Sequence, residues 1–132
     1  MKVRDFMSKN VISCHPYTPI QEVAKLMSDK NISALVVVND DGTLAGVVSQ
    51  TDLVNIRVHE EYWEQWRGLS AKHIMTREVV TISPDATLEE AAKLMKKHGI
   101  HRLVVTETRN HQVYPIGVIS MTDIVRAMAK GV

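Results

Sequence analysis

Apolar side chains recur at helical spacing in two stretches of the chain. In each stretch they stand at i, i+3, i+4 and i+7, which places them on one face of an α-helix. The first set is Ile20, Val23, Ala24 and Met27, and the second is Leu88, Ala91, Ala92 and Met95. The pattern predicts two amphipathic helices, with Met27 and Met95 directed into a core.

A short apolar run rich in β-branched residues follows each predicted helix. The runs are 34–38 and 103–106, and their length and composition favour buried strands. Residues 39–42 read Asn-Asp-Asp-Gly and favour a hairpin turn into a second strand. That strand ends at a polar motif, 49–52 in the first case and 120–123 in the second, where another helix is predicted to start.

The two halves of the chain are copies of one another. A shift of 68 positions aligns 24–27 with 92–95, which both read Ala-Lys-Leu-Met. Beyond the hairpin the shift is 71, and it aligns 46–52 with 117–123. Matches of this number, in this order, indicate an internal duplication.

Each copy reads as β-α-β-β-α, so the sequence predicts an α+β fold. We expect two repeats, 1–54 and 73–132, joined by a helical linker, 55–72. A single repeat is too small to bury both faces of its sheet. We therefore expect the copies to pack sheet against sheet about a pseudo-two-fold axis, with clefts between them.

The linker carries three of the six aromatic residues of the chain, including both tryptophans. Tyr62, Trp66 and Leu69 stand at i, i+4 and i+7, which predicts a helix, and Trp63 lies off that stripe. Two interpretations are open. The aromatics cover the edge of the core, or they form a dimer contact, because aromatic residues are enriched at interfaces.

Composition and charge narrow the function classes. The formal net charge of +1 offers no basic field for nucleic acid. The one cysteine, Cys14, can form no internal disulfide and fits a reducing, cytoplasmic location. The charged segment 1–10 is unlike a secretory signal, and the apolar run 34–38 is too short to span a membrane. No Ser-His-Asp set, P-loop or paired-carboxylate motif stands out, so we expect neither an enzyme nor a resident cofactor.

Taken together, these motifs resemble those of a CBS-domain pair, also called a Bateman module. The shared features are the pairs Phe6-Met7 and Ile74-Met75, the Glu-x-Ala-x-x-Met stretches at 22–27 and 90–95, and the endings 46–52 and 117–123. The resemblance covers nearly the whole chain and is to stand-alone members. It implies a tandem pair of CBS domains that forms homodimers and binds AMP, ADP, ATP, S-adenosylmethionine or a related ligand as a regulatory signal.

The Ser-x-Thr-Asp motifs at 49–52 and 120–123 allow two interpretations. Ser-x-x-Asp at a strand-to-helix junction is typical of a helix capping box. The same carboxylate can accept hydrogen bonds from the 2′- and 3′-hydroxyls of a ribose, while hydroxyl and N–H groups at the helix start can bind phosphate. The resemblance assigns ligand contacts to these positions, and both interpretations can hold together.

The pair His101-Arg102 is the main difference between the copies, because copy one has Ser33 and Ala34 there. The guanidinium and the imidazole can donate to phosphate, as the resemblance implies, or form a solvated basic pair at a strand edge. His98 and His101 lack a clear third ligand, so no metal site is expected.

The resemblance and the pseudo-symmetry imply that each cleft combines the aspartate of one copy with the opening segment of the other. The cleft expected to bind the nucleotide contains Asp123, Ser120, Thr122, His101, Arg102, Ile12, Ser13 and Thr18. The second, weaker cleft contains Asp52, Ser49, Thr51, Val80 and Thr81. It has no guanidinium, so it is expected to prefer ligands with less phosphate, or none.

We therefore expect a regulatory module that binds an adenosine nucleotide such as AMP, ADP or ATP. A ligand in the cleft would tie the repeats together and change the surface offered to a target protein. The alternatives are a ligand-free protein–protein interaction module and a sensor of S-adenosylmethionine or another adenosyl ligand. Binding assays with adenosine ligands separate these hypotheses.

Overall fold

The computed structural model describes residues 1–132 and divides the chain into two compact units. The N-terminal unit is formed by residues 12–79. The C-terminal unit is formed by residues 80–132 together with the opening segment 1–11. Each unit contains one three-stranded sheet.

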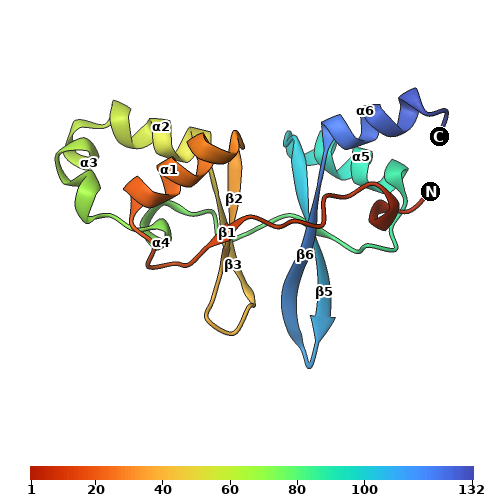
Figure 1. Ribbon diagram of the computed structural model, residues 1–132, viewed down its shortest axis with the longest axis horizontal. Helices are drawn as coiled ribbons and strands as arrows, with labels where there is room; N and C mark the ends of the chain where they lie inside the picture. The colour runs from red at the N-terminus through yellow and green to blue at the C-terminus, as the bar shows by residue number, and fades with distance from the viewer. The chain divides into compact units, whose positions relative to one another are not determined.

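The N-terminal unit contains the helices and strands of residues 12–79 (Figure 1). Its strands are β1 (Ser13–Cys14), β2 (Ala34–Val38) and β3 (Leu44–Ser49). Its helices are α1 (Ile20–Lys30), α2 (Gln50–Val58), α3 (Glu60–Gln65), the 3-10 turn η2 (Trp66–Gly68) and α4 (Ala71–Ile74). Strand β2 lies in the middle, parallel to β1 and antiparallel to β3.

The C-terminal unit repeats this topology. Its elements are the 3-10 turn η1 (Val3–Asp5), β4 (Thr81–Ile82), α5 (Leu88–His98), β5 (Arg102–Arg109), β6 (Gln112–Ser120) and α6 (Met121–Ala129). Strand β5 is parallel to β4 and antiparallel to β6. The predicted β-α-β-β-α repeat and the α+β class are confirmed. No helix of either unit has the length and apolar character needed to cross a bilayer.

Each unit has its own core on the helix-covered face of its sheet. The buried core of the N-terminal unit is Cys14, Val23, Met27, Leu35, Val37, Val48 and Ala71. That of the C-terminal unit is Val3, Ile82, Ala91, Met95, Leu103, Val105 and Ile119. Burying a large aliphatic side chain contributes about 1.5–3 kcal/mol. The predicted core positions Met27 and Met95 are confirmed, being 4% and 1% exposed. Burial also raises the pKa of the Cys14 thiol to about 11, so it behaves as an apolar core group.

The first long helix of each unit ends in the same way. Helix α1 stops at Asn31 (φ 52°) and α5 at Gly99 (φ 63°), both in the left-handed conformation that closes many helices. The chain then turns directly into the central strand. This fixed turn sets which residue begins that strand, Ala34 in one unit and Arg102 in the other.

The opening segment of each copy completes the core of the other unit. Val3, which is fully buried, donates its N–H to the Ala86 carbonyl (2.8 Å) in the C-terminal unit. Ala71 occupies the matching place in the N-terminal unit and donates to the Thr18 carbonyl (2.9 Å). The compact units are therefore a different division of the chain from the sequence repeats 1–54 and 73–132.

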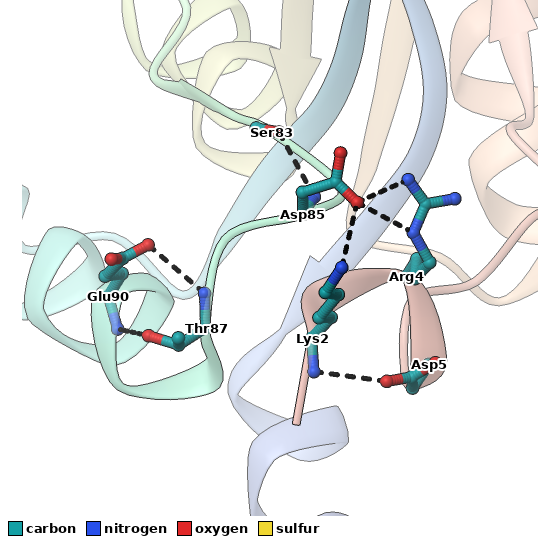
Figure 2. A network of polar contacts seen from close by, with 7 residues as sticks. All are labelled: Lys2, Arg4, Asp5, Ser83, Asp85, Thr87 and Glu90. Atoms are coloured by element: carbon teal, nitrogen blue, oxygen red, sulfur yellow. Dashed lines mark hydrogen bonds and ion pairs between the residues drawn. The ribbon is translucent and has the colours of Figure 1, made fainter.

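Side-chain contacts reinforce this docking in the C-terminal unit (Figure 2). Asp85 accepts from Arg4 (Nη2–Oδ1, 2.6 Å), and the Lys2 ammonium lies 3.6 Å from the same oxygen. These neighbours lower the pKa of Asp85, chiefly through the hydrogen bond from Arg4. Beside them, Thr87 and Glu90 form the capping box that starts α5.

Close packing explains the glycine that opens both Gly-Val-x-Ser motifs. A Cβ on Gly117 would lie 2.7 Å from Met7 Sδ and 2.8 Å from the Ser8 carbonyl oxygen. A Cβ on Gly46 would lie 2.7 Å from the Thr76 carbonyl oxygen and 2.9 Å from Met75 Sδ. The opening Met-Ser and Met-Thr pairs thus need a residue without a side chain at this point of β3 and β6.

The aromatic stretch after α2 is helical only in pieces. The single helix predicted through Tyr62, Trp66 and Leu69 is wrong, because the backbone leaves the α conformation at Gln65 (φ −115°, ψ 4°). Trp63 and Trp66 stack with their ring centroids 5.4 Å apart. Tyr62 and Trp63 are exposed by 51% and 38%, whereas Trp66 and Leu69 are half-buried.

Candidate functional site

Strand pairing brings the predicted polar residues of the C-terminal unit to one end of its sheet. Arg102 begins β5 and pairs with Ser120 at the end of β6, and Thr81 at the start of β4 pairs with Val104. Paired residues project from the same face, and neighbours along a strand alternate. Because Leu103 lies in the helix-covered core, the other four project from the opposite face.

Asp123 is held at the start of α6 by a capping box. Ser120 is the N-cap, and its hydroxyl accepts from the Asp123 N–H (3.3 Å). In return, Oδ2 of Asp123 accepts from the N–H (2.8 Å) and the hydroxyl (3.1 Å) of Ser120. The capping interpretation of the sequence motif is therefore confirmed. The cap also holds the Asp123 carboxylate close to Ser120, the residue that pairs with Arg102 across the strands. The Asp123 side chain is 13% exposed.

The two basic residues of the predicted pair have different surroundings. Arg102 is half-buried, and desolvation lowers the pKa of its guanidinium, which still carries its charge near neutral pH. A partly desolvated cation is well suited to bind an anion. His101 is exposed, and its carbonyl accepts from the N–H of Met121 (2.9 Å), which ties the start of β5 to the start of α6.

The remaining predicted residues of this unit are close in the fold to the same strand ends. Thr122 is exposed in the first turn of α6, one residue before Asp123. Val80 and Thr81 are half-buried at the start of β4. The C-terminal unit thus gathers a carboxylate, hydroxyls and a guanidinium at one end of a single sheet.

The N-terminal unit has the same scaffold and lacks the guanidinium at the start of its central strand. Ser49 caps α2, and Oδ2 of Asp52 accepts from its N–H (2.8 Å) and its hydroxyl (3.0 Å). Across the strands, Ser49 pairs with Ala34, which stands where the other unit has Arg102. Thr51 is exposed in the first turn of α2, and Ser13 begins the neighbouring strand β1.

Ile12 and Thr18, both predicted for the nucleotide site, lie at opposite ends of strand β1. The Ile12 carbonyl accepts from the Val36 N–H (3.3 Å), so Ile12 lies at the same sheet end as Ser49. Thr18 follows the other end of β1, where His15 contacts the Val38 carbonyl (3.1 Å). The Thr18 hydroxyl accepts from the His15 N–H (2.9 Å) and stabilises this turn, and its contact with a nucleotide stays a prediction.

The grouping of these residues into two clefts stays a prediction. Ile12 and Ser13 were expected beside Asp123, and they belong to the N-terminal unit, as Asp52 does. Val80 and Thr81 were expected beside Asp52, and they belong to the C-terminal unit, as Asp123 does.

One residue at the site was missed by the sequence analysis. Arg126 lies one turn after Asp123 in α6, and its Nη1 donates to Oδ1 of that carboxylate (3.0 Å). The i, i+3 spacing of opposite charges on a predicted helix marks Arg126 in the sequence as a possible partner of Asp123. The equivalent residue in the N-terminal unit is Asn55.

The chain matches the family model for the CBS domain twice, over residues 3–59 and 71–130. Protein MJ1232 of Methanocaldococcus jannaschii is 34% identical over 130 residues, which is 98% of this chain and 40% of that protein. An inosine-5′-monophosphate dehydrogenase of Halobacterium salinarum is 29% identical over 123 residues, 93% of this chain and 23% of the enzyme. The chain thus spans less than half the length of these two relatives.

Solved structures of CBS-domain pairs have the same fold. The CBS domain pair of MJ0100, in complex with 5′-methylthioadenosine and S-adenosyl-L-methionine, has a TM-score of 0.85 and 26% identity. The match covers 100% of this chain and 98% of that one. CBSX2 in complex with AMP has a TM-score of 0.82 and 26% identity, covering 98% of this chain and 96% of that one. CBSX2 is a protein of Arabidopsis thaliana.

Proposed function

The chain belongs to the CBS-domain family as a tandem pair of CBS repeats, and from this premise we propose that it is a regulatory module that binds an adenosine nucleotide. The observation that carries the proposal is the juxtaposition of Arg102, Ser120 and Asp123 at one sheet end of the C-terminal unit. A carboxylate that accepts from ribose hydroxyls and a cation that binds phosphate are the two contacts that a nucleotide requires.

The chemistry of the two units favours different ligands. The C-terminal unit offers a guanidinium for phosphate, so AMP, ADP or ATP fit it best. The N-terminal unit has Ala34 in place of Arg102 and suits an adenosine compound with less phosphate or none. The adenosyl ligands in the MJ0100 structure support this second possibility, and S-adenosylmethionine is our alternative ligand.

We expect the module to regulate rather than to catalyse. The hydroxyl that donates to Asp123, that of Ser120, is engaged with it in the capping box that starts α6, which is a structural role. A ligand that binds one conformation of the pair more tightly would shift the population of conformations and change the surface offered to a target protein. The function of a ligand-free interaction module is the competing hypothesis.

Two expectations concern the setting of the module. Helix α6 exposes Met121, Val125 and Met128, three apolar side chains on one face, which favours association into the homodimer expected from the sequence. Sedimentation at micromolar concentration should then report twice the chain mass. A cytoplasmic location remains our expectation, and localisation of a tagged chain would check it.

The direct test of the proposed function is native mass spectrometry followed by calorimetric titration. Chain isolated from cells should carry a small molecule whose mass matches an adenosine compound. Titration of the ligand-free chain with AMP, ATP, adenosine and S-adenosylmethionine should then give saturable heat for at least one of them. A folded chain that carries nothing and binds none of the four would leave the interaction-module hypothesis in its place.

A further inference from the structure

The number of hydrogen bonds that Asp123 can still accept is limited. Each oxygen of a carboxylate has two lone pairs and accepts two hydrogen bonds well. Oδ2 of Asp123 already accepts from the N–H and the hydroxyl of Ser120, at 2.8 and 3.1 Å. Only Oδ1 is left for a ligand, and without competition it could accept from both hydroxyls of a ribose.

Arg126 takes part of that remaining capacity. Its Nη1 lies 3.0 Å from Oδ1 of Asp123, close enough for a charge-assisted hydrogen bond. The Arg126 side chain is 58% exposed, whereas that of Asp123 is 13% exposed. The guanidinium therefore covers the one carboxylate oxygen that a sugar would use, and it leaves a single position open on it.

The N-terminal unit lacks this competitor. Oδ2 of Asp52 accepts from the N–H and the hydroxyl of Ser49, at 2.8 and 3.0 Å, as in the other unit. Asn55 stands in the position of Arg126 and makes no hydrogen bond to the carboxylate. Oδ1 of Asp52 consequently accepts from no group of its own unit and keeps both positions.

We infer that the residue one turn after each aspartate sets how many sugar hydroxyls the aspartate can bind. Arg126 restricts Asp123 to one hydroxyl, and Asn55 leaves Asp52 able to bind a 2′,3′-diol. The inference rests on the proposed function, which it refines. The C-terminal unit would recognise its ligand mainly through phosphate and accept ribose and 2′-deoxyribose alike, whereas the N-terminal unit would select ribose.

The test compares adenosine with 2′-deoxyadenosine, because neither carries a phosphate that Arg126 could attract. To observe one aspartate at a time, the other is changed to Asn, whose amide oxygen can keep the cap while its NH₂ cannot accept from a diol. In Asp52→Asn, calorimetry should show little preference for adenosine. Adding Arg126→Asn should raise that preference about 2–10-fold, the effect of one further hydrogen bond.

The reciprocal variant is the matched control. In Asp123→Asn the chain should prefer adenosine, and adding Asn55→Arg should lower the preference by a similar factor, about 2–10-fold. A purely structural role of Arg126 would change the stability of α6 or the affinity for both nucleosides equally, and would not change their ratio.

Three outcomes decide the matter. Opposite changes of the ratio in the two variants support the inference. Unchanged ratios in variants that still bind adenosine overturn it and leave the proposed function intact. A wild-type chain that binds no adenosine compound overturns the proposed function, and the inference with it.

Discussion

The two sheet ends have the same scaffold and different chemistry. In both units a serine caps a helix and holds an aspartate three residues later by the same hydrogen bonds. The residue across the strands is Arg102 in the C-terminal unit and Ala34 in the N-terminal unit. The duplication has thus kept the groups that position a carboxylate and changed the cation near it. We therefore expect the two units to differ in ligand preference because of the residues at these two positions.

The largest expected effect is the loss of a ribose acceptor. Asp123→Ala should weaken binding of adenosine and AMP alike, because the sugar hydroxyl that donates to the carboxylate is left unpaired in the complex, at about 1–3 kcal/mol or roughly 5- to 150-fold in affinity. It should also lower Tm by a few degrees through the lost cap. Calorimetry below the unfolding transition measures the first effect, and a thermal scan the second.

The control for that variant is a cap of the same unit outside the site. Thr87 and Glu90 form an equivalent capping box at the start of α5 (Figure 2). Thr87→Ala should lower Tm as Asp123→Ala does and leave both affinities at the wild-type value. An Asp123→Ala chain that is less stable but binds normally would mean that the carboxylate is only a cap.

Substitution of Gly117 and Gly46 tests whether each unit is stabilised by its own core. Gly117→Ala and Gly46→Ala should each cost about 1–3 kcal/mol, because the new methyl group meets backbone oxygen at 2.8 Å and 2.7 Å respectively. Hydrogen exchange should show Gly117→Ala loosening segments 1–11 and 80–132, and Gly46→Ala loosening 12–79. Equal loosening throughout the chain in both variants would contradict two separate cores.

Much of this scaffold can be predicted from local sequence signals. The stripes ending in Met27 and Met95 predict helices because their spacing is set by the helix itself. The turn before Gly42 (φ 87°) and the serine caps are equally local. The pseudo-symmetry of the sequence predicts that the opening segment of one copy lies beside the other copy, but the docking of Val3 beside Ala86 could not be predicted, because only the tertiary fold brings these two residues together.

The candidate site shows the same limit. The sequence motifs locate the capped aspartates and the strand-opening Arg102, because each lies beside a recognisable turn. They do not reveal that Arg126 occupies an oxygen of Asp123, since an i, i+3 pair forms only when both rotamers allow it. Nor could spacing alone show that Thr18 belongs to a turn with His15.

The smallest expected effect is on the pH dependence of stability, and it arises from the ion pair between Arg4 and Asp85 that holds segment 1–11 in place. Arg4 lowers the pKa of Asp85, so the pair contributes stability above the ordinary carboxyl pKa and loses it as pH falls through the lowered value. Both groups are exposed, so the effect is small. The equivalent pair in the N-terminal unit is Lys72 and Tyr17, which has no carboxylate.

Urea unfolding at pH 7 and pH 3 measures this effect. Arg4→Ala should make the free energy of unfolding slightly less dependent on pH than it is in the wild type. Lys72→Ala should leave that dependence unchanged. A pH dependence that is the same in all three chains would show that the ion pair contributes nothing to the docking of segment 1–11.

The most direct test of the central claim is calorimetric titration of Arg102→Ala with AMP and with adenosine. If Arg102 binds phosphate, the variant should lose about 1.5–3 kcal/mol for AMP, roughly ten- to a hundredfold or slightly more in affinity, and bind adenosine as the wild type does. The reciprocal Ala34→Arg should strengthen AMP binding by the N-terminal unit. Equal AMP affinity in the wild type and in Arg102→Ala would contradict the assignment of this sheet end as the nucleotide site.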